Sequence, residues 1–106
     1  MSKYLVQGSY TGQGLRGLLK EGGSKRREAS EQLVRELGGR LETFYYAFGG
    51  DDFFIILDLP GNVDAAAVSM IANASGAVTS RMTVVLAPED IDQAAKKTVA
   101  FRPPGE

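Results

Sequence analysis

The sequence of 106 residues contains no cysteine and no histidine. Without these side chains the protein cannot form disulfides, thiolate nucleophiles or imidazole bases, and it lacks the ligands of most zinc and haem sites. We therefore expect no resident metal and no cofactor. Carboxylate, hydroxyl, amide, phenol and cationic groups remain available for binding or catalysis.

Long apolar runs and an excess of one charge are also missing. No stretch approaches the ~20 apolar residues of a membrane span, and the segment MSKYLVQGSY lacks the apolar region of a secretion signal. We expect a soluble, cytoplasmic protein with no membrane partner. The 12 Lys and Arg residues nearly balance the 13 Asp and Glu residues, giving a formal net charge of −1. Because no positive excess attracts phosphates, a nucleic-acid partner is disfavoured.

What is present is a regular alternation of strand and helix patterns. Apolar, aromatic and β-branched residues predict four strands, at 3–10, 40–48, 52–59 and 77–87. Helical spacing predicts two main helices, at 24–37 with Ser24 as N-cap and at 62–75, besides a weak or broken helix in the glycine-rich segment 11–23 and a short one from Pro88. We interpret the chain as one domain, 1–106, in which residues 97–106 form an extended tail.

The order β-α-β-β-α-β is the split βαβ pattern of ferredoxin-like α+β folds, here with an added C-terminal helix. Right-handed crossovers then place both main helices on one face of an antiparallel four-stranded sheet. Assigning the more apolar alternate positions to the helices leaves the other face open, with Leu5, Gln7, Ser9, Phe54, Ile56, Asp58, Arg81, Thr83 and Val85 on it.

The hairpin strand 40–48 can present either parity to the open face. A four-residue turn adds Thr43 and Tyr45, whereas a bulge adds Phe44 and Tyr46; we favour Tyr45. With either set the face is too apolar for bulk water, so we expect a homo-oligomer in which a second copy packs its own sheet there.

The polar members of the open face form the main candidate site. Asp58 and Arg81 are predicted to form a buried pair, and the desolvation cost of such a pair suggests a binding role. One hypothesis is a small organic ligand between two sheets, bound by Gln7, Ser9 and Thr83. The simpler alternative is that these groups only satisfy one another at an interface between subunits.

Two further segments suggest binding, each with an ordinary structural alternative. EGGSKRRE places Gly23, Ser24, Lys25 and Arg26 at a helix N-terminus that could hold an anion, or that is merely a capped helix start. GGDDF is one letter from the GGDEF signature of diguanylate cyclases, and its Asp51 and Asp52 could bind a divalent metal. Asp and Gly are equally the residues that a tight turn requires. The first strand, YLVQGSYTG, has no acidic residue to complete a two-metal site.

The segments KYLVQGSYT, GLLKEGGSKRREA, LGGRLETFYYAFG, DFFIILDLP, SGAVTSRMTVVLAPEDIDQAAKK and FRPP are together similar, nearly end to end, to the bacterial GYD domain family. The resemblance implies a ferredoxin-like protein of the dimeric α/β-barrel kind, in a family of unassigned function. Asp51 stands where the family's Gly-Tyr-Asp has tyrosine, and Asp52 matches its aspartate. This departure argues against an essential catalytic tyrosine in the turn.

An enzymatic hypothesis follows from the same resemblance. Similar dimeric barrels suggest cofactor-free isomerase, dehydratase or oxygenase chemistry on a small substrate. Asp58 would then be the base, and Tyr45 or Arg81 would stabilise an enolate-like anion. This hypothesis requires the three side chains to converge on one vacant space.

Overall fold

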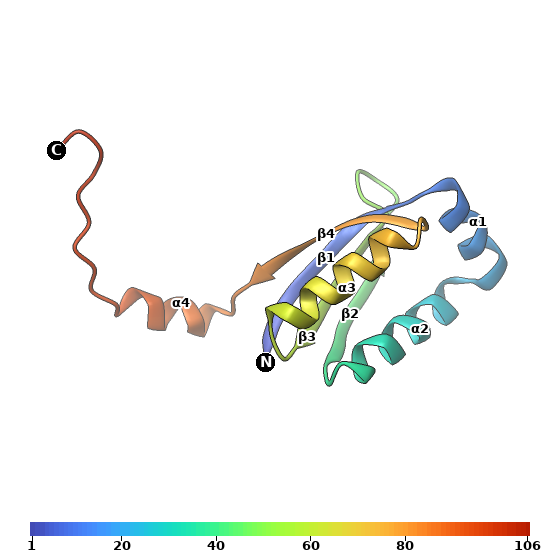
Figure 1. Ribbon diagram of the computed structural model, residues 1–106, viewed down its shortest axis with the longest axis horizontal. Coiled ribbons are helices and arrows are strands. Elements are labelled where there is room, and N and C mark those ends of the chain that lie inside the picture. Colours follow the sequence, from blue (N-terminus) through green and yellow to red (C-terminus); the bar gives the residue numbers. More distant parts are fainter.

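Four antiparallel strands form a single sheet in the order β2-β3-β1-β4 in the computed structural model, which describes residues 1–106 (Figure 1). The strands are β1 (Ser2–Tyr10), β2 (Arg40–Tyr46), β3 (Phe53–Leu59) and β4 (Val78–Val85). The helices are α1 (Gly12–Glu21), α2 (Gly23–Glu36), α3 (Asn62–Ala74) and α4 (Pro88–Ala95). The predicted ferredoxin-like α+β fold is confirmed.

The hydrophobic core lies between the sheet and the helices α2 and α3. Alternate residues of the central strands point into it, because successive side chains of a strand face opposite sides. The predicted choice of helix-facing positions is confirmed for β1 and β3, since the buried core comprises Tyr4, Val6, Phe53, Ile55, Leu57 and Leu59 with Val34, Ala65 and Val68 from the helices. The phenol of Tyr4 donates to Asn62 Oδ1 at 2.7 Å, so its burial leaves no polar group unpaired.

The segment before α2 differs from the prediction. Residues 12–21 form a complete helix, whose first turn is capped by Thr11 through a bond from the Gly14 N–H to its hydroxyl at 3.1 Å. α2 begins directly afterwards with Gly22, at φ 90°, as N-cap, so the prediction that Ser24 caps it is wrong. Only glycine adopts this backbone conformation readily, and the chain can therefore turn sharply between the two helices.

The end of the chain leaves the body of the protein. Beyond β4 the polypeptide passes through α4 into a tail that lies far from the sheet (Figure 1). Every residue from Pro88 to Glu106 is exposed. The radius of gyration is 17.0 Å, whereas a compact domain of this length has about 13 Å. We refer to residues 86–106 as the C-terminal arm.

Candidate functional site on the open sheet face

Cross-strand pairing arranges the open face in rows. Tyr45 pairs with Phe54 and Thr43 with Ile56, so the favoured parity of β2 is confirmed. The register shift lies between Leu41 and Thr43, before these positions. Three rows cross the face: Tyr45, Phe54, Gln7 and Arg81; Thr43, Ile56, Leu5 and Thr83; and Arg40, Asp58, Lys3 and Val85.

The predicted pair of Asp58 and Arg81 is wrong. Asp58 lies opposite Lys3 and Arg81 lies opposite Gln7, four residues further along β1. At ~3.3 Å per residue, the two rows are about 13 Å apart. Arg81 instead makes an ion pair with Asp51 at the hairpin tip, with the shorter N–O distance at 2.9 Å. Alternation had identified the shared face correctly, but it carries no information about register.

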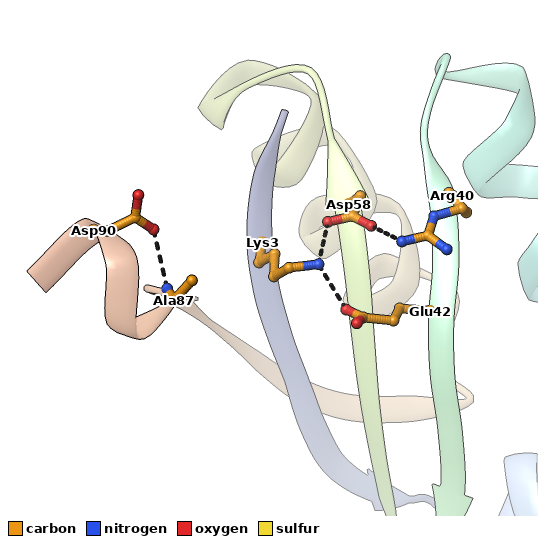
Figure 2. A network of polar contacts seen from close by, with 6 residues as sticks. All are labelled: Lys3, Arg40, Glu42, Asp58, Ala87 and Asp90. Atoms are coloured by element: carbon orange, nitrogen blue, oxygen red, sulfur yellow. Dashed lines mark hydrogen bonds and ion pairs between the residues drawn. The ribbon is translucent and has the colours of Figure 1, made fainter.

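Asp58 belongs to an ionic cluster of Lys3, Arg40, Glu42 and Asp58 (Figure 2). The Lys3 ammonium donates to Asp58 Oδ1 and to Glu42 Oε2, both at 2.9 Å, and Arg40 donates to Asp58 Oδ2 at 2.8 Å. Both oxygens of the Asp58 carboxylate thus accept hydrogen bonds, and the residue is only 7% exposed. Two cations and two anions leave the cluster without net charge.

The contacts within the ionic cluster favour the charged forms of Lys3 and Asp58. Hydrogen bonds from Lys3 and then Arg40 lower the pKa of Asp58 against the opposing effect of burial. Hydrogen bonds to Glu42 and Asp58 raise the pKa of Lys3. A carboxylate with a lowered pKa is a weak general base, because a base works best when its pKa is near the operating pH.

The remaining predicted catalytic residues do not join Asp58. Tyr45 and Arg81 occupy opposite edges of one row, on β2 and β4, and three strand spacings of ~4.8 Å separate them. Within one chain the three side chains therefore do not converge on a common vacancy.

The polar side chains predicted to bind a ligand do share the open face. Gln7 and Ser9 lie on β1, opposite Arg81 and Thr79, and Thr83 lies on β4 opposite Leu5. None of the side chains of Gln7, Ser9 and Thr83 makes a hydrogen bond within the chain, in contrast to the side chains of the ionic cluster. Next to them Tyr45 is 69% exposed and Phe54 is 37% exposed. The central rows thus combine uncovered aromatic rings with free polar groups.

The predicted anion site at the start of α2 is divided by the fold. Gly23, Ser24 and Lys25 lie in the first turn, and the carbonyl of Gly23 accepts a bond from the Tyr46 phenol at 3.2 Å. Arg26 instead lines a cavity between α2, α3 and the sheet. The first turn of α2 contains no acidic residue that could neutralise these cations.

This cavity has a volume of about 110 Å³ and mostly apolar walls, which include Phe44, Phe53 and Ala72. Tyr10 and Ser30 also line it. Sequence reasoning missed these two residues. In the sequence Tyr10 is an ordinary strand end and Ser30 an ordinary helix-surface residue. They line a cavity only because of how the two helices are spaced on the sheet.

The hairpin tip is tied to the first strand by Asp52. Its carboxylate accepts a bond from the Tyr10 N–H at 2.8 Å, and its own N–H donates to the Gly8 carbonyl at 2.7 Å. Asp51 forms an ion pair with Arg81. No group of three or more His, Cys, Asp or Glu residues is placed to hold a metal ion. The two adjacent carboxylates thus act as anchors of the turn.

An antiparallel sheet with both main helices on one face defines the class of this protein as ferredoxin-like α+β. The family model described as the GYD domain matches residues 4–95, and the chain belongs to this family. The comparison with curated proteins and the comparison with solved structures give no match. None of the helices has the length and apolar character that crossing a membrane requires.

Proposed function

We propose that the protein is a homo-oligomeric small-molecule-binding protein in which a second copy covers the open face. The observation that carries this proposal is that two surfaces of one protomer lack cover. The open face exposes Tyr45 and Phe54. In the C-terminal arm the side chains of Leu86, Ile91, Val99 and Phe101 are each more than half exposed. Contiguous exposed apolar surface of this kind marks interaction sites.

A second copy of the chain is the occupant that accounts for both surfaces. In a two-fold dimer each protomer offers the same surfaces, so the open face and the arm of one can both meet the other. Electrostatics do not oppose this contact, because the ionic cluster is neutral and the formal net charge of the chain is only −1. The arm leaves the body at the end of β4, which also contributes to the open face.

Packing of two such faces against each other would bury polar side chains that have no hydrogen-bond partner within the chain. The side chains of Gln7, Ser9 and Thr83 would lose water there, and buried polar groups without hydrogen bonds are costly. A small organic molecule with donors and acceptors would satisfy Gln7 and Thr83, which lie in adjacent rows, while Tyr45 and Phe54 provide flat apolar contacts. Such a site resembles the common pattern of apolar walls with a few polar groups.

Binding fits the geometry better than catalysis. The enzymatic hypothesis needs Asp58 as a free base, but two cations hold this carboxylate in its charged form and lower its pKa. Tyr45 and Arg81 lie in a different row of the face. The ionic cluster on the open face is therefore assigned a structural role rather than a catalytic one.

Sedimentation velocity at micromolar concentration tests the proposal. We expect the wild-type protein to sediment as an oligomer and Phe54→Lys, on the open face, to sediment as a monomer. Met70→Lys is the matched control, because Met70 is 71% exposed on α3 and lies outside the open face. Native mass spectrometry then detects a retained small molecule. A wild-type monomer, or a Phe54→Lys variant that still assembles, would overturn the proposed assembly.

A further inference from the structure

The cavity on the helix side of the sheet belongs to each protomer alone. It exists because α2 packs against β2 whereas α3 packs against β4 and β3, and both helices lie on the same side of the sheet (Figure 1). Small side chains, Ser30 on α2 and Ala72 on α3, face the space between them. These features leave about 110 Å³ unfilled within an otherwise packed layer.

The walls of the cavity suit a flat apolar group. The rings of Phe44 and Phe53 contribute to the lining, together with aliphatic residues such as Val34 and Val68. A closed apolar cavity of roughly 150 Å³ is enough to hold benzene. The present cavity is somewhat smaller but open on one side, so a single ring fits with its substituent at the opening.

Arg26 gives the cavity a charged group without a protein partner. Its residue is only partly exposed, and its guanidinium makes neither an ion pair nor a hydrogen bond. The arginines that have acidic partners are Arg27, Arg35, Arg40 and Arg81, while Arg16 and Arg102 are exposed. A guanidinium beside an apolar space matches a carboxylate, which it binds through two parallel hydrogen bonds.

The neighbours of Arg26 in the cavity do not compete with such an anion. The Ser30 hydroxyl donates to the Arg26 carbonyl at 3.0 Å and leaves the guanidinium free. Burial, reinforced by Tyr46, raises the pKa of Tyr10 well above its usual value, so its phenol stays neutral at physiological pH. No acidic side chain lines the cavity.

We propose that this cavity binds a small aromatic carboxylate, with its ring between α2 and α3 and its carboxylate paired with Arg26. All the groups involved come from one protomer. The inference therefore goes beyond the proposed assembly and does not depend on a second copy.

Titrations with benzoate and with benzyl alcohol, followed by ¹⁵N–¹H NMR of the full chain, test this proposal. The two probes share the ring and differ in charge. We expect benzoate to shift the backbone amides around the cavity, including those of Ser30, Val34 and Ala72. We also expect it to bind about tenfold more tightly than benzyl alcohol, because the bond to Arg26 is charge-assisted.

Variants test separately the two parts of the site, the Arg26 guanidinium and the apolar cavity. Arg26→Gln should abolish the preference for benzoate and leave weak binding of both probes. Arg27→Gln is the matched control, since Arg27 is the next residue of α2, does not line the cavity and pairs with Glu31; it should keep the preference. Ala72→Leu should fill the cavity and eliminate binding of both probes.

The outcomes separate this inference from the assembly. Equal affinity of the two probes for the wild-type protein, a preference that survives Arg26→Gln, or shifts scattered outside the cavity would overturn it. Benzoate binding to the Phe54→Lys variant with wild-type affinity would support it, whatever the oligomeric state. Sedimentation as a monomer would overturn the assembly and leave the cavity site intact.

Discussion

Replacing Asp58 by asparagine measures what the ionic cluster contributes to stability. The side chain of Asp58 is 10% exposed and accepts bonds from Lys3 and Arg40, whose side chains are 36% and 65% exposed. Removing one partner of a fully buried pair costs about 3–5 kcal/mol. Here water can solvate the two cations once the carboxylate is gone. We therefore expect Asp58→Asn to lower the free energy of unfolding by about 1–3 kcal/mol at neutral pH.

The same contribution should depend on pH with a defined sign. Hydrogen bonds from Lys3 and Arg40 lower the pKa of Asp58 in the folded state, whereas an unfolded aspartate titrates near ~3.9. The folded protein then binds this proton less tightly than the unfolded chain does. The stabilisation is complete above the unfolded pKa and is lost as the pH falls through the folded pKa. The difference between wild type and variant should therefore shrink below about pH 4.

Urea unfolding followed by circular dichroism, at neutral pH and across the acid range, measures both effects. Glu42→Gln is the control, because Glu42 makes one bond to Lys3 and its side chain is 37% exposed; it should cost less than about 1 kcal/mol. An Asp58→Asn variant as stable as wild type at neutral pH would refute the assigned role. A loss of the same size at every pH would refute the electrostatic explanation.

Four further substitutions concern two glycines, the hairpin tip and Tyr10. Gly8→Ala should lower the free energy of unfolding by more than about 3 kcal/mol, because the new Cβ would overlap the Thr79 carbonyl. Gly17→Ala has open space around it and should raise the free energy of unfolding by about 0.5–1 kcal/mol, measured by thermal unfolding. Asp52→Ala should cost about 1–2 kcal/mol in the same assay by removing its bond from the Tyr10 N–H. In an alkaline absorbance titration Tyr10 should ionise above the usual range of tyrosine, because burial raises its pKa, and Tyr10→Phe should remove this late phase.

The fold and the two faces of the sheet were predictable because they depend on local patterns. Alternation along β1 and β3 separates the buried Val6 and Ile55 from the open-face Leu5 and Ile56. Pairing register depends on contacts between distant segments, and alternation repeats every two residues. For this reason the face of Asp58 was predicted correctly but its partner was not.

The cavity was not predictable from the sequence for a related physical reason. A residue such as Val68 has the same apolar spacing whether the neighbouring helix touches it or stands away from it. The separation of α2 and α3 depends on how each one packs on the sheet. The cluster of cations did single out Arg26, but as part of a helix N-terminus rather than as a group beside an apolar space.

The hairpin tip is connected to this cavity through β1. Asp52 binds the main chain of β1 on both sides of Ser9, through Tyr10 N–H and the Gly8 carbonyl. The ring of Tyr10 then packs edge-on against Phe53, with ring centroids 5.4 Å apart, and both residues line the cavity. A side chain anchored at its own backbone and at its ring has little freedom to move. Asp52 therefore ties the hairpin tip to the strand that carries Tyr10, which forms part of the cavity wall, while Asp51 pairs with Arg81.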